Sequence, residues 1–152
     1  ILQGAWLGEA KHWDIIEVRG EIARLTSATQ GVFIPQALNL DLIDGVSFRK
    51  GCYPGQEIVA RVRYLGKLKY RMSRAVLKRD PIPEPGDPIF THPTHAHSNR
   101  AGTIVNTAKF STRGGGEMLV TTPVGAIISD KFYCACNDEA LQLIKVPPEA
   151  TS

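Results

Sequence analysis

Beyond Gly66 the sequence alternates short apolar runs with turn-forming residues, and this spacing limits the fold more than any other feature. The apolar runs lie at residues 72–77, 89–90, 102–105, 118–121 and 141–146. Between them stand a proline-rich stretch at 81–88 and three glycines at 114–116, which predict a hairpin turn. Five or six short strands at this spacing are typical of a small antiparallel barrel or sandwich. We therefore expect an antiparallel β-barrel over residues 67–148 and a disordered tail at 149–152.

The first 66 residues have a different pattern, that of mixed helix and strand. A β-branched run predicts a strand at 13–19, and residues 20–25 either continue it or begin a short helix. Residues 33–36 are expected to be extended, because a proline disfavours helical geometry in the residue before it. Residues 39–45 predict a turn or short helix closed by glycine. The fold class expected for the whole chain is α+β.

The clearest predicted helix spans residues 55–66. Pro54 precedes it and Gly66 follows it, the usual asymmetry between the start and the end of a helix. Three apolar residues at i, i+4 and i+7 are expected to face a core: Ile58, Val62 and Leu65. The change of pattern after this helix predicts a junction between two domains near residues 66–70.

Composition narrows the class of protein. The chain has 152 residues, 43% hydrophobic and 22% charged, as in soluble globular proteins. A net charge of +3 is too small to indicate nucleic-acid binding by itself. No apolar run is long enough to span a bilayer, and no signal-peptide pattern occurs. Three cysteines without the spacing of a disulfide framework favour a cytoplasmic location. Because Ile1 begins in mid-pattern, we expect the chain to be part of a longer protein.

Residues 49–55 (Arg-Lys-Gly-Cys-Tyr-Pro-Gly) place Cys52 directly before the predicted helix. Unpaired N–H groups at a helix N-terminus and the charges of Arg49 and Lys50 favour the thiolate form of a cysteine, which is a nucleophile and a metal ligand. A lone cysteine is also commonly a small buried residue, and the glycines of a turn often serve only its backbone geometry. Both interpretations stay open on these residues alone.

A group of basic residues lies around the predicted junction. Its members are Arg61, Arg63, Lys67, Lys69, Arg71 and Arg74. The group is either a solvated helix face and strand edge or a surface that binds carboxylates, phosphates or RNA.

Histidines and cysteines of the second domain do not predict a metal site. The histidines stand in a proline-containing loop without the spacing of metal ligands, and we expect them to be solvated: His92, His95 and His97. Cys134 and Cys136, one residue apart on a strand, are expected to point to opposite faces. No P-loop, dinucleotide-binding or Ser-His-Asp pattern occurs either.

Three neighbouring segments resemble the signature region of the YgfZ-like folate-binding proteins. These proteins are relatives of the glycine-cleavage T-protein, a tetrahydrofolate-dependent aminomethyltransferase. The segments are residues 33–40 (FIPQALNL), 45–48 (GVSF) and 50–61 (KGCYPGQEIVAR). The resemblance is detailed over residues 13–71 and extends beyond them only in architecture. The motif K-G-C-Y-x-G-Q-E is specific, and it favours Cys52 as a functional thiol over a buried small residue.

The resemblance implies that residues 1–66 are the C-terminal portion of an α/β folate-binding domain, and that the chain corresponds to the C-terminal half of a three-domain protein. It implies tetrahydrofolate as cofactor and a role in the assembly or repair of iron–sulfur clusters in client enzymes. The radical enzymes that modify tRNA are one such class of client. Cys52 is the functional thiol in this interpretation. Its supporting motif residues are Lys50, Gly51, Tyr53, Gly55, Gln56 and Glu57.

The same resemblance bears on folate contacts. The pterin-contacting segment of the T-protein relatives aligns with residues 17–21, where Arg19 replaces their glutamate and Glu21 stands at their glycine position. The catalytic aspartate of the T-protein belongs to a region that precedes this chain. We therefore expect neither the pterin contact that the glutamate makes in those relatives nor aminomethyl transfer. Arg19 and Arg61 are predicted as folate-contacting residues.

Three functions are compared on this basis. A folate-binding accessory protein that supports iron–sulfur clusters ranks first, and it is not expected to turn over a substrate itself. An RNA- or partner-binding module that uses the basic junction ranks second. An aminomethyltransferase ranks third. No membrane partner is expected, and the sequence predicts neither the client nor the oligomeric state.

Overall fold

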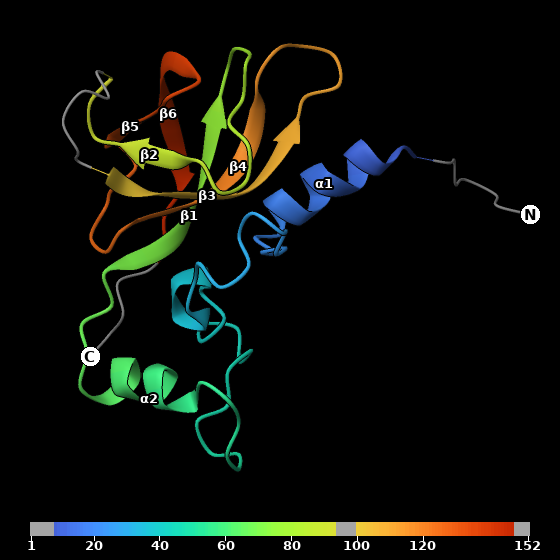
Figure 1. Ribbon diagram of the computed structural model, residues 1–152. Coiled ribbons are helices and arrows are strands. Elements are labelled where there is room, and N and C mark those ends of the chain that lie inside the picture. Colours follow the sequence, from blue (N-terminus) through green and yellow to red (C-terminus); the bar gives the residue numbers. More distant parts are fainter. Residues whose placement is uncertain (1–7, 94–99, 148–152) are drawn as a thin grey trace, which may run out of the picture.

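A closed β-barrel with helices on its outside forms the part of the chain that the computed structural model describes, residues 8–93 and 100–147 (Figure 1). The strands of these residues are β1 (Tyr70–Leu77), β2 (Pro88–Phe90), β3 (Arg100–Lys109), β4 (Gly116–Pro123), β5 (Lys131–Cys134) and β6 (Asn137–Lys145). They pair antiparallel in the order β1-β4-β3-β2-β5-β6, and β6 returns to β1. The α+β class and the small antiparallel barrel are confirmed.

Apolar side chains fill the barrel and also cover one of its outer faces. In β4, Met118 and Val120 belong to the interior cluster, whereas Leu119 between them belongs to an outer cluster. Successive side chains of a strand point to opposite faces, so a strand covered on both sides is buried along its length. β4 is therefore buried at every position except its last. This outer face carries the N-terminal segments of the chain.

The helix α1 (Ala10–Arg19) and the 3₁₀ helix η1 (Pro35–Leu38) supply the outer cover. Val18 of α1 and Leu38 of η1 pack with Met72, Val105 and Leu119 of the barrel. Figure 1 shows α1 lying beside the barrel, where it contacts β3 and β4. The segment that resembles the folate-binding proteins is thus held directly against the barrel.

The strand predicted at 13–19 is wrong, because these residues form all but the first three residues of the ten-residue helix α1. Ile15 and Val18, three residues apart, turn to one side and pack on the barrel. Trp13 and Ile16 are exposed on the other side. The β-branched residues favour a strand locally, but packing on the apolar face of the barrel stabilises a helix instead. Residues 20–25 form neither a strand nor a helix.

The helix predicted at 55–66 is confirmed as α2 (Gln56–Tyr64), but its expected apolar face is wrong. Ile58 is 60% exposed and Leu65, beyond the end of the helix, is 87% exposed. Val59 is the buried residue of α2, and Val62 is only partly buried. The helix touches the rest of the described chain along a narrow strip, so the spacing of its apolar residues does not show which side is covered.

The remaining local predictions have mixed outcomes. The glycine hairpin is confirmed, since Phe110 N–H donates to the carbonyl of Gly115 at 3.0 Å between β3 and β4. Residues 39–45 form turns rather than a helix, closed by Gly45 N–H on the carbonyl of Leu40. The extended stretch at 33–36 is correct only to Ile34, because Pro35 begins η1. The four-residue strand β5 was not among the predicted apolar runs.

Two further expectations have no direct outcome. The predicted tail at 149–152 lies outside the described residues. The division of the chain at residue 66 stays a prediction, although β1 begins at Tyr70, soon after it. In the described part of the chain, neither α-helix has the length and apolar character needed to cross a bilayer.

Candidate functional site

The motif cysteine lies on the surface in the loop that leads into α2. Gly55 is the N-cap of α2 and has a left-handed backbone, with φ of +83°, which glycine adopts without steric cost. Gln56 closes the turn from both sides: its Oε1 accepts the N–H of Tyr53 at 3.2 Å, and its own N–H donates to the carbonyl of Tyr53 at 3.2 Å. Cys52 is exposed directly before this turn. The motif therefore builds a fixed turn and leaves its thiol accessible.

Charged residues surround Cys52 with little internal pairing. Arg49 and Lys50 are exposed, and neither has an ion pair within the described residues. Glu57 pairs with Arg61 one helical turn later at 2.7 Å, with both side chains exposed. The thiol of Cys52 makes no hydrogen bond to the described part of the chain. An external partner can therefore approach Cys52 without displacing a structural contact.

A small cavity of about 280 Å³ brings together the three segments that carry the resemblance. It is lined by Pro35, Leu40, Gly45, Val46, Ser47, Lys50 and Tyr53. Lys50 and Tyr53 flank Cys52 at a distance of two residues and one residue in sequence. The motif loop is thus packed onto the segment that follows η1.

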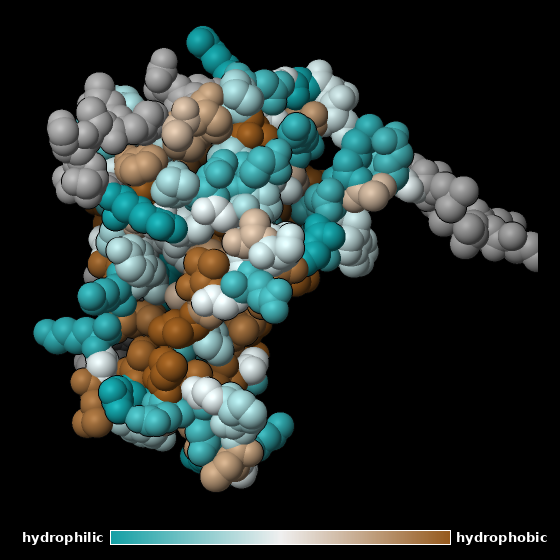
Figure 2. Space-filling model, viewed as in Figure 1, coloured by the Kyte–Doolittle hydropathy of each residue, from teal (hydrophilic) through white to brown (hydrophobic). Residues whose placement is uncertain are grey.

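A larger cavity of about 600 Å³ lies between the segment before η1, the end of α2, the linker to β1 and the strands β3 and β4. Its apolar lining residues are Val32, Phe33, Ile34, Ala37, Val62, Leu68 and Tyr70, and its cationic ones are Lys67, Lys69 and Arg100. Figure 2 shows apolar side chains gathered between the barrel and the α2 end of the molecule. We call this space the junction pocket. Apolar walls with three cations suit a ligand that has a planar apolar part and anionic groups.

The three cations reach the junction pocket from two distant parts of the sequence. Lys67 and Lys69 come from the linker after α2, and Arg100 from the first position of β3. Arg100 donates to Thr103 Oγ1 at 2.7 Å, which holds its guanidinium along the strand. Within the described residues no carboxylate neutralises any of the three. Arg100 was not predicted, because no pattern in the sequence links it to the linker lysines.

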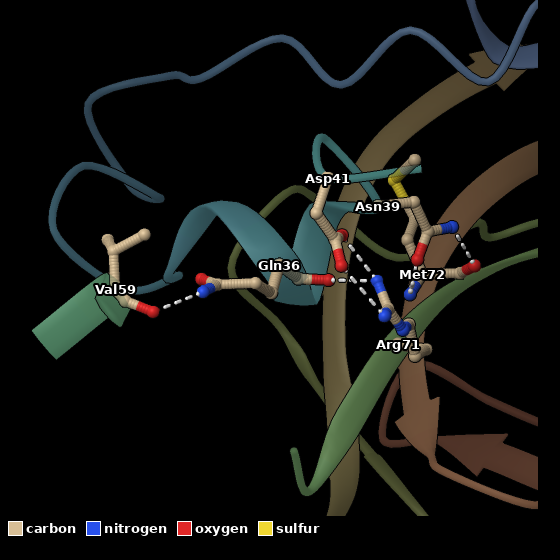
Figure 3. Close-up of polar contacts among 6 residues, drawn as sticks. All are labelled: Gln36, Asn39, Asp41, Val59, Arg71 and Met72. Carbon is tan, nitrogen blue, oxygen red and sulfur yellow. Dashed lines mark hydrogen bonds and ion pairs between the residues drawn. The ribbon is translucent and has the colours of Figure 1, made fainter. Parts of the chain in front are cut away.

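Arg71 is not part of a solvated or ligand-binding surface. Its guanidinium lies 2.6 and 2.9 Å from the two carboxylate oxygens of Asp41, and it also donates to the carbonyl of Gln36 at 2.9 Å (Figure 3). Both side chains are almost fully buried, at 7% and 6% exposed. Arg74, the next basic residue, donates to the carbonyl of Arg19 at 3.2 Å. Two members of the predicted basic group thus serve the fold.

The polar cluster around Arg71 is a feature that sequence reasoning missed. The side chain of Asn39 hydrogen-bonds to both backbone polar groups of Met72 on β1. It donates to the carbonyl at 2.7 Å and accepts the N–H at 3.3 Å (Figure 3). Gln36 Nε2 donates to the carbonyl of Val59 in α2 at 2.7 Å. The cluster therefore ties η1 to the barrel on one side and to the motif helix on the other.

The predicted folate-contacting residues lie apart from both cavities. Arg19 pairs with Glu117 of β4 at 2.7 Å, and this hydrogen bond and charge raise the pKa of Arg19. Arg61 pairs with Glu57 on the exposed side of α2. Neither lines the junction pocket or the small cavity. Their contact with folate stays a prediction. To make it, each arginine would have to break its ion pair with a carboxylate of this chain and pair with a carboxylate of the ligand.

The expectation that Cys134 and Cys136 point to opposite faces is wrong. β5 ends at Cys134, and Ala135 and Cys136 form the turn into β6, so strand alternation does not apply to Cys136. The two Sγ atoms lie 3.0 Å apart. Within the described residues no group of three or more His, Cys, Asp or Glu side chains is placed to hold a metal ion. His92 is exposed, and His95 and His97 lie outside those residues.

Comparison with known proteins shows which protein this chain is similar to. No protein-family model matches the chain. Over 135 residues, or 89% of its length, the chain is 42% identical to the tRNA-modifying protein YgfZ of Photobacterium profundum. The chain is therefore similar to YgfZ over most of its own length. It spans 40% of that relative's length, which fits the expectation that it corresponds to about half of a YgfZ-like protein.

Proposed function

We propose that the chain is part of a folate-binding accessory protein that supports the assembly or repair of iron–sulfur clusters in client enzymes, with Cys52 as its functional thiol. The observation that best supports this proposal is that Cys52 is exposed on a turn that its own motif fixes, and that its thiol makes no hydrogen bond within the described residues. The relationship to a protein named as tRNA-modifying supports a link to tRNA modification, through client enzymes of that class. Free thiols agree with a reducing compartment such as the cytoplasm.

Cys52 is the contact point in this proposal. Its thiolate would bind transiently to a cluster iron, a sulfur species or a cysteine of the client. Arg49 and Lys50 supply unneutralised positive charge beside it, which attracts an anionic cluster or sulfur species. Gly55 and Gln56 hold the loop in one conformation, so the thiol is presented at a fixed place.

Tetrahydrofolate is proposed to bind in the junction pocket. Folate carries a planar pteridine, an aromatic ring and a glutamate with carboxylates. The apolar walls suit the rings, and Lys67, Lys69 and Arg100 suit the carboxylates. A volume of about 600 Å³ also lies within the range of small-molecule sites. Arg61 does not line this pocket, and it stays a candidate for folate contact outside the pocket, because its exposed pair with Glu57 costs little to break.

Substitution of the thiol tests the accessory role. In cells that lack a YgfZ-like protein, we expect Cys52→Ser to lower client-enzyme activity to the level without the protein, while thermal unfolding stays unchanged. The matched control is Ser111→Ala, an exposed substitution in the β3–β4 hairpin that should keep full activity. Full complementation by Cys52→Ser, or its failure to fold, would contradict the proposal.

Folate titration tests the pocket. We expect Lys67→Ala and Arg100→Ala each to weaken tetrahydrofolate binding by about 10- to 100-fold, since a hydrogen bond to a charged group contributes about 1.5–3 kcal/mol. Lys109→Ala, at the far end of β3 from Arg100, is the control and should bind normally. Normal binding by both pocket variants would move the folate site elsewhere, with Arg19 and Arg61 as the next residues to test.

The basic residues of the linker also allow a test of the alternative function, binding of RNA or of a partner. If the chain binds tRNA through Lys67 and Lys69, affinity should fall steeply with salt and should not depend on Cys52. Such a result would favour a binding module over the accessory thiol. A tetrahydrofolate-dependent aminomethyl transfer would favour the transferase instead.

A further inference from the structure

A second thiol site lies at the end of the barrel away from α2. Cys134 ends β5 and is fully buried in the interior cluster. Cys136 stands in the turn to β6, partly buried against the same cluster. Figure 1 shows the β5–β6 turn at the opposite end of the molecule from α2, so this pair is separate from the Cys52 motif.

The two sulfur atoms are already adjacent. Their separation of 3.0 Å is shorter than the van der Waals contact distance of two sulfur atoms. Cys136 Sγ also donates to the carbonyl of Pro81 at 3.6 Å, which holds its side chain over the barrel end. A disulfide bond is about 2.05 Å long, so the two Sγ atoms would have to approach by about 1 Å to form one.

We propose that Cys134 and Cys136 form a redox-active dithiol, which a small disulfide such as glutathione disulfide converts reversibly into an intramolecular disulfide. This inference does not depend on the proposed folate or iron–sulfur function.

The exchange balances in two steps. Cys136, the more accessible thiol, loses its proton and attacks one sulfur of glutathione disulfide, whose S–S bond breaks and releases one glutathione. Cys134 then attacks Cys136 Sγ, and the mixed disulfide breaks and releases the second glutathione. The two protein thiols are oxidised by two electrons, and one glutathione disulfide is reduced to two thiols that carry the two protons away.

Two physical features set how this site responds. Burial, and then the contact with Cys134, raise the pKa of Cys136 to about 12, so its thiolate is scarce near neutral pH and the exchange is slow. Only Ala135 separates the two cysteines, and so short a loop constrains the unfolded chain little. The disulfide would therefore add little stability and would be reduced more easily than a structural one. Slow and reversible oxidation suits sustained rather than brief oxidative conditions.

Thiol mapping of the wild-type protein tests this inference directly. The protein is equilibrated with glutathione buffers of increasing disulfide content, then denatured, alkylated and digested with trypsin. Cleavage after Lys131 and Lys145 gives a peptide, 132–145, with both thiols of the pair, and cleavage after Lys50 and Arg61 gives one, 51–61, with Cys52. We expect peptide 132–145 to change from two alkyl groups to none, with loss of two hydrogen atoms, and dithiothreitol to reverse the change.

The matched variant is Cys134→Ala, which removes the resolving thiol. Its Cys136 should stop at a mixed disulfide with glutathione, detected as added glutathione on peptide 132–145. The inference is overturned if the wild-type peptide keeps two alkyl groups in every buffer while Cys52 becomes glutathionylated, because the oxidant is then shown to be active. A wild-type peptide that retains glutathione without closing a disulfide would overturn it as well.

Discussion

In the cysteine motif, some residues form the turn, and Cys52 is the residue that the turn leaves exposed. Gly55 and Gln56 have clear structural roles, through a left-handed backbone and two hydrogen bonds. Gly51 has an ordinary backbone, and a Cβ there would meet nothing within 4 Å. Packing among the residues that the structure describes therefore does not explain its presence in the motif. Close approach of a ligand or client to the loop beside Cys52 is a physical reason for a glycine at such a place.

Substitution of the two motif glycines should separate these roles. We expect Gly55→Ala to destabilise α2 by about 1–2 kcal/mol, the cost of a left-handed backbone in a residue with a Cβ. Protection of α2 amides against hydrogen exchange should fall accordingly. Gly51→Ala, the control, should change this protection by no more than about 0.5 kcal/mol. Equal effects of the two substitutions would contradict the structural assignment of Gly55.

The buried pair of Arg71 and Asp41 should matter more than the exposed pairs of this chain. Asp41→Ala leaves a guanidinium buried without its carboxylate, and breaking a buried pair in this way costs about 3–5 kcal/mol. Glu57→Ala breaks the exposed pair with Arg61 and should cost at most about 0.5 kcal/mol. Urea unfolding followed by circular dichroism gives both values. A similar small effect of Asp41→Ala would show that water reaches Arg71.

Among the elements, the strands were the easiest to predict and the helices the hardest. Short apolar runs between glycine and proline turns indicate strands locally, whichever partners those strands have. The identity of α1 depended on the outer face of the barrel, which overrode the strand preference of Ile15, Ile16 and Val18. The covered side of α2 likewise depended on contacts with Gln36, more than twenty residues earlier in the chain.

In the candidate site, too, features formed by neighbouring residues were easier to predict than contacts between distant ones. The motif around Cys52 is continuous in sequence, so its turn follows from local residues, but whether the thiol is exposed or buried did not follow from them. The Arg71–Asp41 pair joins residues 30 positions apart, and the junction pocket joins residues as distant as Val32 and Thr121. No local pattern reveals such pairings. Because β5 ends at Cys134, Cys136 lies in the turn after it. The side-chain direction that strand alternation predicts for Cys136 is therefore wrong.

The β5–β6 turn gives the chain a predictable response to alkaline pH. Burial and the adjacent Cys134 raise the pKa of Cys136 from 9.0 to about 12, and the charge of Asp87 acts in the same direction. Because the folded state holds this proton more tightly, its contribution to stability is complete below pH 9 and is lost as the pH rises toward 12. The free energy of unfolding should therefore fall more steeply over this range in the wild type than in Cys136→Ala. Parallel curves for the two proteins would contradict the shift.

On the scale of the whole molecule, α2 is the least firmly held of the described elements. Val59 is its buried residue, and the carbonyl of Val59 accepts the hydrogen bond of Gln36. Ile58, Tyr64 and Leu65 are all more than half exposed. The barrel strands, in contrast, are paired on both sides and covered by two apolar clusters. The motif loop therefore sits on an element that can move relative to a rigid body.

Hydrogen exchange should show this difference in stability. Amides of β3 and β4 are expected to exchange only through global unfolding, whereas those of α2 should exchange through local opening and at least about tenfold faster, a difference of about 1.4 kcal/mol. Gln36→Ala should speed exchange in α2 further and leave β3 unchanged. Exchange of α2 and β3 at one common rate would show that they unfold together.

Closure of the barrel also decides how a partner can attach to this chain. Because β6 pairs with β1, the strands of the described residues close into a ring, and none of them lies at the end of an open sheet. Extension of the sheet by a client peptide or by a second copy is therefore disfavoured. Recognition is left to side chains on loops and pockets, where each contact can be altered one residue at a time without disturbing the sheet.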